Sequence, residues 1–212
     1  MDNLFDTINE GEGREQRLAE LAGQVSVCTR CDLSQTRTKT VFGTGDPNSP
    51  LMLIGEGPGE NEDASGLPFV GRAGELLDRI LGAVELSREQ VYLTNLVKCR
   101  ASVEEGGRVR NRPPQGAEVK ACSPYLEAQL ETIRPRIILC LGAPAARSII
   151  DPNFKITRDR GKWYETHGAK TMATFHPAYI LRQRDEELRQ TKLQVWQDIQ
   201  NVYTEYERAL EG

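Results

Sequence analysis

Four of the five cysteines have the spacing of metal ligands. Cys28 and Cys31 form a C-x-x-C pair, and Cys99 and Cys122 follow far downstream. Disulfides are rare in intracellular proteins, whereas such a pair with two distant thiols can hold either a zinc ion or an iron–sulfur cluster. These residues alone leave the two metals open. The fifth cysteine, Cys140, lies in the apolar run IILCLG, which indicates a buried free thiol.

A glycine-rich segment with several carboxylates follows the first apolar run. It reads GEGPGENEDASGLPFVGRAG from Gly55 onward, and its glycine spacing does not match the dinucleotide-binding fingerprint. No Gly-Lys-Ser/Thr of a P-loop is present either. A pyrophosphate would also be repelled by the carboxylates of this segment, which are Glu56, Glu60, Glu62 and Asp63. We therefore expect a pocket that sets backbone amides and a carboxylate against a small, neutral, flat ligand.

These residues need a scaffold, and short apolar runs alternate with helical patterns along the chain. The expected strands are Leu51–Gly55, Val91–Leu96, Ile137–Leu141 and Thr171–Phe175. Apolar residues recur at helical spacing over about 13–27, 73–84, 116–133, 143–150 and 185–209. This alternation predicts an α/β fold with three layers, α/β/α, around a central four-stranded parallel sheet. Ligands of such sheets bind beyond the carboxyl ends of the strands, where the distinctive side chains fall.

The length of 212 residues fits one domain with a terminal extension. We divide the chain into an N-terminal extension and helix over 1–24 and one domain over 25–212. The net charge of −4 argues weakly against a nucleic-acid binder, but residues 21–182 taken alone are net positive. No apolar run approaches the roughly 20 residues of a membrane helix, and the acidic N-terminus lacks the apolar core of a signal peptide. We expect a cytoplasmic monomer with no membrane partner.

The segment Arg100–Pro114 contains glycines and prolines and has no apolar periodicity, which predicts a long loop. Arginines alternate within it at Arg108, Arg110 and Arg112. A solvated loop would explain any one of these charges. Three alternating arginines beside a site instead indicate contact with phosphate groups.

Four separated motifs, in this order, resemble those of the bacterial and archaeal family 4 uracil-DNA glycosylases. They are GEGPGENEDASGLPFVGRAG, TNLVKCR, RNRPP followed by a cysteine, and FHPAY, and the match spans about residues 25–183. The resemblance implies an enzyme that hydrolyses the N-glycosidic bond of uracil in single- or double-stranded DNA and leaves an abasic site. It also implies a [4Fe–4S] cluster held by Cys28, Cys31, Cys99 and Cys122, which favours iron over zinc.

The resemblance also assigns roles in the reaction. Phe69 would stack on the uracil ring, and the Asn95 amide would pair with O4 and N3–H. Cytosine presents the reversed pattern and would leave the polar groups of the site unpaired. His176, as a neutral imidazole, would donate a hydrogen bond to O2 as negative charge grows on the departing base. Glu56 would orient the attacking water or stabilise the cationic sugar.

Three more residues of the glycine-rich segment complete the implied uracil site. Gly55 and Gly57 line it, and Glu62 lies where the methyl group of thymine would have to fit. Gly57 stands where the family usually has alanine. We expect this difference to widen the pocket slightly.

Contact with DNA is expected from residues near the last motif as well. Arg182 and Arg184 join the three alternating arginines as candidates for phosphate contact. A base must leave the stack before it can be attacked, and Tyr179–Arg182 could fill the space that it vacates. The same residues read equally well as the start of the last helix.

The chain departs from the family between Cys99 and Cys122, where the spacing is longer than usual. X-type relatives with insertions here become covalently joined to uracil-containing DNA through a histidine of this loop. The matching position is Asn111, so we expect turnover instead of capture. Two rival hypotheses are a non-excising or covalent uracil-DNA-binding iron–sulfur protein of the X-type branch and a zinc-stapled nucleotide-binding module.

Overall fold

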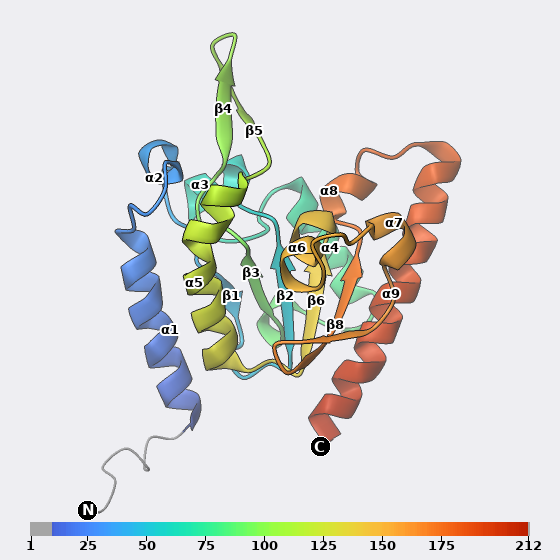
Figure 1. Cartoon of the computed structure of the whole chain (residues 1–212). Helices are drawn as coiled ribbons and strands as arrows, with labels where there is room; N and C mark the ends of the chain where they lie inside the picture. The colour runs from blue at the N-terminus through green and yellow to red at the C-terminus, as the bar shows by residue number, and fades with distance from the viewer. Residues whose placement is uncertain (1–9, 212) are drawn as a thin grey trace, which may run out of the picture.

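A six-stranded sheet forms the centre of the molecule, with strand order β1-β3-β2-β6-β8-β7 (Figure 1). The structure is a computed structural model and describes residues 10–211, with side chains from residue 13. Residues 1–9 of the predicted extension lie outside the described residues. The sheet comprises β1 (Thr44–Gly45), β2 (Leu51–Gly55), β3 (Tyr92–Asn95), β6 (Ile137–Leu141), β7 (Tyr164–Thr166) and β8 (Ala169–Thr174).

The four predicted strands are confirmed as the inner, parallel part of this sheet. The prediction of four strands in total was wrong, because β1 and β7 add one antiparallel strand at each edge. Both edge strands are only two or three residues long. A segment that short cannot show the alternation from which strands are predicted.

Helices cover both faces of the sheet, which confirms the three-layer α/β/α architecture (Figure 1). One face is covered by α1 (Glu10–Ser26), α5 (Gly116–Ile133) and α6 (Ala143–Ile149), and the other by α4 (Arg72–Gly82) and α9 (Asp185–Glu211). Each of these five helices lies within a few residues of its predicted bounds. None of the helices in residues 10–211 is long and apolar enough to cross a membrane.

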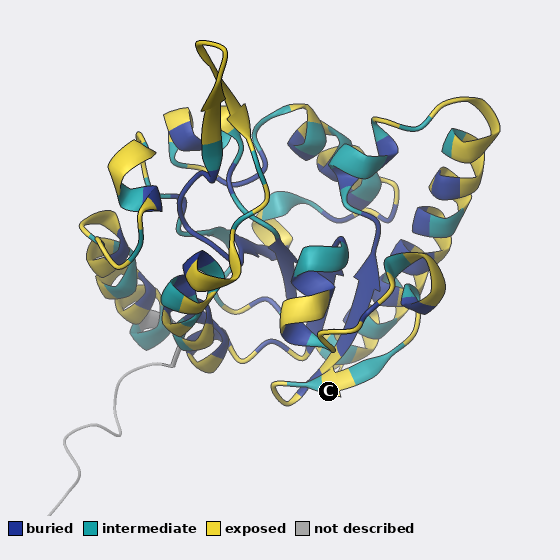
Figure 2. Ribbon diagram, turned by 45° about the horizontal axis from the view of Figure 1, so that its top comes forward, coloured by how far each residue is buried: buried dark blue, intermediate teal, exposed yellow. Residues whose placement is uncertain are grey.

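The inner strands of the sheet are buried (Figure 2), and apolar side chains from its two faces form two separate core clusters. All five residues of β2 are buried, as expected for a parallel strand that is covered on both sides. Met52 and Ile54 pack toward α5 and α6, whereas Leu51 and Leu53 pack toward α4 and α9. Leu18 of α1 joins the first cluster, so this helix packs as part of the domain.

The segment predicted as a long loop is instead largely a β-hairpin, formed by β4 (Ser102–Glu105) and β5 (Arg108–Asn111). It projects above the carboxyl ends of the sheet strands (Figure 1). Gly106 and Gly107 connect the two strands with φ angles of 60° and 72°. Only glycine adopts two such angles in succession without strain, and this pair forms the tight turn that joins twisted strands.

Shorter helices complete the rim above the sheet: α2 (Leu33–Thr36), α3 (Glu60–Ser65), α7 (Ile156–Asp159) and α8 (Pro177–Ile180). Of the two interpretations of Tyr179–Arg182, the start of the last helix was wrong, because α8 is separate from α9. The Tyr179 ring stacks on Phe175 with centroids 4.9 Å apart, and Ile180 is buried. These two side chains are therefore occupied in packing within the domain.

Candidate active site

A cleft of about 700 Å³ opens at the carboxyl ends of the parallel strands. This volume suits a nucleotide-sized ligand. The residues with the most distinctive predicted roles all line the cleft, namely Glu56, Phe69, Asn95 and His176. Glu56 follows β2, Asn95 ends β3, and His176 follows β8, so the sheet itself brings distant parts of the sequence together.

Gly55 allows the aromatic ring and the amide to meet at one wall of the cleft. A Cβ atom at Gly55 would lie 2.4 Å from Asn95 Oδ1 and 2.7 Å from Phe69 Cζ. Both distances are far below van der Waals contact, so a side chain here would displace one of the two groups. The predicted convergence of Gly55, Phe69 and Asn95 is therefore present in the fold.

The neighbouring glycine has a different consequence from the one expected. A Cβ atom at Gly57 would lie 2.7 Å from Val97 Cγ2. A methyl group at this position would press against the Val97 side chain. Glycine avoids that clash, which is a different effect from widening the cleft. Gly57 nevertheless lines the cleft through its backbone.

Phe69 has a φ angle of 54°, in the left-handed region that non-glycine residues rarely occupy. Such a conformation costs roughly 1 kcal/mol or more and persists only when surrounding contacts fix it. Glu62 supplies one set of contacts. Its Oε1 accepts hydrogen bonds from the backbone N–H groups of Val70 and Gly71, both at 2.9 Å. Its Oε2 accepts one from Gly59 N at 3.0 Å.

The Glu62 carboxylate thus holds the loop around Phe69, a role that the sequence did not suggest. That Glu62 also lies beside the 5-position of a bound base stays a prediction. Arg88, a residue that the sequence analysis missed, braces the loop from the other side. Its guanidinium donates hydrogen bonds to the carbonyl oxygens of Pro68 and Phe69 and pairs with Asp78. The backbone at Phe69 is therefore held from both sides, and Phe69 lines the cleft.

Gly74 in α4 gives a direct test of this loop conformation. Alanine usually stabilises a helix relative to glycine by about 1 kcal/mol. At Gly74, however, a Cβ atom would lie 1.7 Å from the Phe69 carbonyl oxygen. We expect Gly74→Ala to lower the free energy of unfolding by about 2–4 kcal/mol, as measured by urea denaturation. The matched control is Gly82→Ala in the same helix, where nothing lies within 4 Å. Equal effects of the two substitutions would contradict the described loop.

His176 is fixed as a hydrogen-bond donor toward the cleft. Its Nδ1 accepts a hydrogen bond from Ala178 N at 3.0 Å, which leaves the proton of the neutral ring on Nε2. Burial, with a smaller contribution from the Arg182 charge, lowers the pKa of His176 to about 4, although Glu62 acts in the opposite direction. The imidazole is therefore neutral at pH 7. Its ring centroid lies 6.2 Å from that of Phe69.

Glu56 places a carboxylate beside these groups. Burial raises its pKa above the usual value, and the Arg182 charge opposes this shift in part. Glu56 Oε1 is buried and has no hydrogen-bond partner. Among residues 13–211, every other buried side-chain oxygen or nitrogen has one. An unpaired buried carboxylate oxygen is costly and usually has a functional explanation. The geometry suits an oxygen that receives a proton or orients a water molecule in the cleft.

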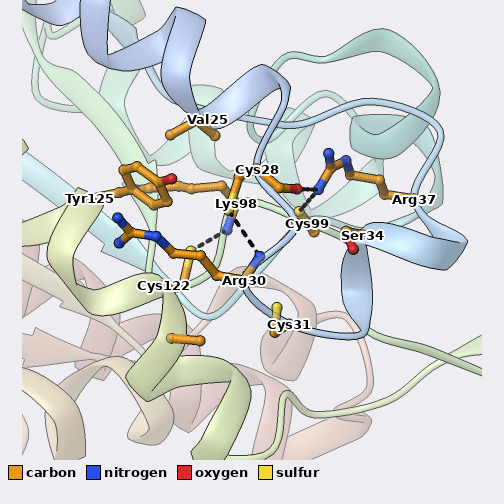
Figure 3. A pocket seen from close by; sticks show the side chains of 11 residues that line it. Val25, Cys28, Arg30, Cys31, Ser34, Arg37, Lys98, Cys99, Cys122 and Tyr125 are labelled. Carbon is orange, nitrogen blue, oxygen red and sulfur yellow. Dashed lines mark hydrogen bonds between the residues drawn. The ribbon is translucent and has the colours of Figure 1, made fainter.

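The four predicted metal-binding cysteines line a small cavity (Figure 3). Side chains from α1, α2 and α5 line the same cavity. Arg37 Nη1 donates to Cys99 Sγ at 3.3 Å, and Lys98 N donates to Cys122 Sγ at 3.3 Å. Burial raises the pKa of Cys99 to about 11, so a nearby positive metal is needed to hold it as a thiolate. Cys140, by contrast, is fully buried away from this cavity, as predicted for a free thiol.

In the described part of the chain, no three cysteine, histidine or carboxylate side chains converge closely enough to hold a single metal ion. The four thiols instead surround the cavity from its different sides (Figure 3). This spread is compatible with a group larger than one ion. Four thiol donors with hydrogen bonds to sulfur are also the donor set of an iron–sulfur cluster.

The five predicted phosphate-binding arginines do not behave alike. Arg108 and Arg110 are exposed on the hairpin, Arg182 is exposed at the cleft, and Arg184 is exposed just beyond α8. Arg112 lines the cleft but differs from the other four in being paired, and its contact with phosphate stays a prediction. Its Nη1 and Nη2 donate to the buried carboxylate of Glu118 at 2.8 and 2.6 Å, so this guanidinium is already paired.

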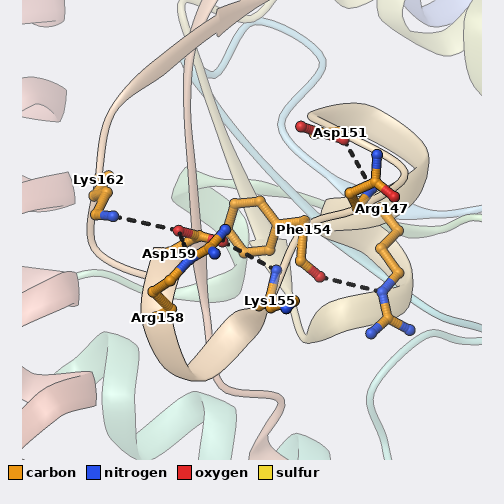
Figure 4. A network of polar contacts seen from close by, with 8 residues as sticks. Arg147, Asp151, Phe154, Lys155, Arg158, Asp159 and Lys162 are labelled. Carbon is orange, nitrogen blue, oxygen red and sulfur yellow. Dashed lines mark hydrogen bonds and ion pairs between the residues drawn. The ribbon is translucent and has the colours of Figure 1, made fainter.

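A polar network anchors the rim on the α6 side of the cleft (Figure 4). The buried Asp159 carboxylate accepts hydrogen bonds from Arg158, from Lys162 and from the backbone N–H of Lys155. These contacts, chiefly the one with Arg158, keep the pKa of Asp159 below its usual value. The network holds α7, whose first residue Ile156 lines the cleft.

Comparison with known proteins agrees with this fold and this arrangement of side chains. The family model described as "Uracil DNA glycosylase superfamily" matches residues 42–200, and the chain belongs to that superfamily. It is similar to the type-4 uracil-DNA glycosylase of Thermotoga maritima, with 42% identity over 85% of this chain and 92% of the relative. The type-4 enzyme of Archaeoglobus fulgidus is 40% identical over 78% and 84% of the two chains. That of Saccharolobus solfataricus is 44% identical over 76% of each.

Proposed function

We propose that this protein is a uracil-DNA glycosylase that hydrolyses the N-glycosidic bond of uracil in DNA during repair. The observation that carries the proposal is the convergence of Phe69, Asn95, His176 and the unpaired Glu56 oxygen in one cleft. The three relatives described above are named type-4 uracil-DNA glycosylases, which supports the same activity. The expected cytoplasmic location and monomeric state stay predictions.

Recognition of the base would use the wall formed around Gly55. A uracil that lies against the Phe69 ring brings its polar edge to the Asn95 amide, which has one acceptor and two donors. Asn95 is only 2% exposed, so water cannot replace a hydrogen bond that a wrong base fails to make with its amide. That penalty is how a buried amide rejects a near-isostere such as cytosine.

Bond cleavage would be driven by stabilisation of charge on both sides of the breaking bond. His176 Nε2–H donates to O2 of the base, where negative charge develops as the electrons of the C–N bond move onto the ring. On the sugar, positive charge develops, and the Glu56 carboxylate stabilises it or orients the water that adds to it. The water loses a proton, the base gains one, and the products are free uracil and an abasic site.

Release of free uracil tests this proposal directly. Purified protein should release uracil from single-stranded and U:G oligonucleotides and leave matched thymine and cytosine oligonucleotides intact. Asn95→Ala should abolish most of the release while the protein stays folded. Full activity of Asn95→Ala, or binding of uracil-DNA without release, would reject the proposal and favour a non-excising DNA-binding protein.

The same reaction separates turnover from covalent capture. Asn111 lines the cleft at the end of β5, and its Oδ1 accepts a hydrogen bond from Arg100 Nε at 2.7 Å. A carboxamide in this position is a poor nucleophile compared with an imidazole. We therefore expect no protein–DNA adduct on denaturing gels. An adduct would favour the covalent X-type alternative.

The four cysteines fit a [4Fe–4S] cluster, and we propose that they hold one. Cys28 and Cys31 lie between α1 and α2, whereas Cys99 follows β3 and Cys122 lies in α5. A cluster bound to all four supplies a rigid link between these segments and need not take part in the reaction. Four thiols, with no histidine or carboxylate among the residues that line the cavity, form a donor set that zinc or a cluster accepts, and the resemblance to the family 4 enzymes favours the cluster.

Replacement of one ligand should remove the metal and much of the stability. We expect Cys122→Ser to lose its iron and its visible absorption. Because metal binding contributes several kcal/mol to folding, the melting temperature should fall by at least about 10 °C. Elemental analysis and thermal unfolding measure both effects, and Cys140→Ala is the control that should retain iron. Zinc in the intact protein, or unchanged iron in Cys122→Ser, would contradict the cluster.

Salt dependence of DNA binding should distinguish the hairpin arginines. We expect Arg110→Ala to reduce the slope of log Kd against log salt concentration by about one, because one phosphate contact is lost. Arg112→Ala should leave the slope unchanged and lower the stability, because it leaves the buried Glu118 unpaired. Fluorescence anisotropy over a range of salt concentrations measures the slopes. Identical slope changes would show that Arg112 also reaches the DNA.

A further inference from the structure

Lys98 is among the largest fully buried side chains of the protein, with 1% of its surface exposed. Lys98 lines the cysteine cavity (Figure 3), and its Nζ reaches the backbone oxygen of Asn95 at the end of β3. Lysine is almost never fully buried unless its charge is paired. Among the described residues, no carboxylate lies within 4 Å of Lys98 Nζ. An ion pair with a carboxylate therefore does not explain the position.

Three oxygen atoms accept hydrogen bonds from Lys98 Nζ. They are the backbone oxygen of Asn95 at 2.8 Å, Thr94 Oγ1 at 2.6 Å and Gln129 Oε1 at 2.6 Å. An ammonium group has three N–H donors, so each donor has one acceptor. Gln129 is itself fixed, because its Nε2 donates to Phe42 O and to Tyr92 Oη. Lys98 thus ties the end of β3 to the middle of α5.

The backbone around Lys98 connects the two sites of the protein. On one side, Lys98 N donates to Cys122 Sγ, and the next residue is Cys99. On the other side, Leu96 N donates to Gly55 O at 3.0 Å and Val97 N donates to Glu56 O at 3.4 Å. The five-residue segment 95–99 therefore runs from the base-recognition amide to the cysteine cavity.

We infer that Lys98 is a positioning residue that holds Asn95, and with it the wall at Gly55, in the geometry needed to bind uracil. The Lys98–Asn95 hydrogen bond closes the turn after β3 from within, and the turn sets the direction in which the Asn95 side chain leaves the strand. Segment 95–99 also transmits the rigidity of the cysteine site to the cleft. The inference rests on the proposed function only in assigning uracil as the ligand of Asn95.

A double-mutant cycle tests whether Lys98 acts through Asn95. We expect Lys98→Met to lower kcat/KM for uracil release by about 10–100-fold, because the three hydrogen bonds of Nζ are lost and their buried acceptors lose a donor. In an Asn95→Ala background, the same substitution should lower it by less than about twofold. A purely structural role would give effects that multiply. Multiplying effects, or no effect of Lys98→Met alone, would overturn the inference.

Gln129→Leu provides a second, milder variant in case Lys98→Met does not fold. It removes one acceptor and keeps the lysine, and we expect a 3–10-fold loss that again disappears in the Asn95→Ala background. Ile133→Val is the matched control, since Ile133 lies one turn further along α5 and packs in the apolar core. All variants should be compared at equal iron content. An Ile133→Val effect that equals that of Gln129→Leu would overturn the inference.

Hydrogen exchange gives a readout that does not depend on catalysis. The backbone amides of Leu96 and Val97 donate to Gly55 and Glu56, so they report the geometry of the turn. We expect Lys98→Met to speed their exchange at least about tenfold, while Ile133→Val leaves it unchanged. Unchanged exchange in Lys98→Met would overturn the inference. If the unmodified protein released no uracil, the proposed function would fail, and the exchange rates would still decide the role of Lys98.

Discussion

Replacement of His176 by alanine should lower kcat for uracil release by about 10²–10³-fold and leave KM nearly unchanged. Loss of a single preorganised donor to a developing oxyanion has this magnitude. The donor contributes mainly in the transition state, where O2 of the base carries the most charge, so binding of the intact DNA depends on it little. Single-turnover and steady-state release of uracil separate the two parameters.

His167 supplies the matched control for this prediction, since it is the other histidine of the chain. It is exposed in the turn between β7 and β8, at the amino end of β8, whereas the cleft lies at the carboxyl ends of the strands, and its Nδ1 lies 3.5 Å from a Glu127 oxygen. His167→Ala should retain the activity of the unmodified protein. If His176→Ala differed from His167→Ala only in KM, the imidazole would bind the substrate without stabilising the departing base.

Glu56→Gln should lower kcat by about 10²–10⁴-fold, because the amide cannot accept a proton from water or stabilise a cationic sugar as a carboxylate does. In the proposed mechanism the ionised form of Glu56 is the active one. Since burial raises its pKa, activity should fall with decreasing pH before an ordinary glutamate would titrate. His176 stays neutral until the pH approaches about 4, so it does not set this limb.

Substitution of Arg182 should shift the pH at which activity falls, while Glu56 and His176 themselves stay unchanged. Its positive charge favours the ionised form of Glu56 and disfavours protonation of His176. Arg182→Gln should therefore raise both pKa values and shift the fall in activity to higher pH. A limb near pH 6.5 that disappears in His176→Ala would contradict this assignment, because it would mean that the imidazole titrates at its ordinary pKa.

Much of the architecture could be predicted because its elements are long and regular. The inner strands and the five long helices have clear apolar patterns, and the rule that ligands bind at the carboxyl ends of parallel strands placed Asn95 and His176 correctly. The hairpin was missed although a signal was present. Two adjacent glycines, Gly106 and Gly107, lie between segments of matching length, which is typical of a two-residue turn.

The contacts that brace the site could not be predicted, because their partners are set by tertiary structure. Arg88 binds the carbonyl oxygens of Pro68 and Phe69, and backbone carbonyl groups leave no mark in a sequence. Lys98 lies within a recognised motif, yet a lysine in a motif is ordinarily expected at the surface. The pairing of Arg112 with Glu118 could not be predicted either, because it depends on how the hairpin meets α5.

The central claim is that one cleft holds an extrahelical uracil between Phe69, Asn95 and His176. A crystal structure of Glu56→Gln bound to a uracil-containing oligonucleotide tests it most directly, since this variant should bind DNA and cleave slowly. We predict the uracil ring against Phe69, its O4 and N3–H on the Asn95 amide, and its O2 within about 3 Å of His176 Nε2. A uracil that remains stacked in the DNA, or that lies away from these three side chains, would contradict the claim.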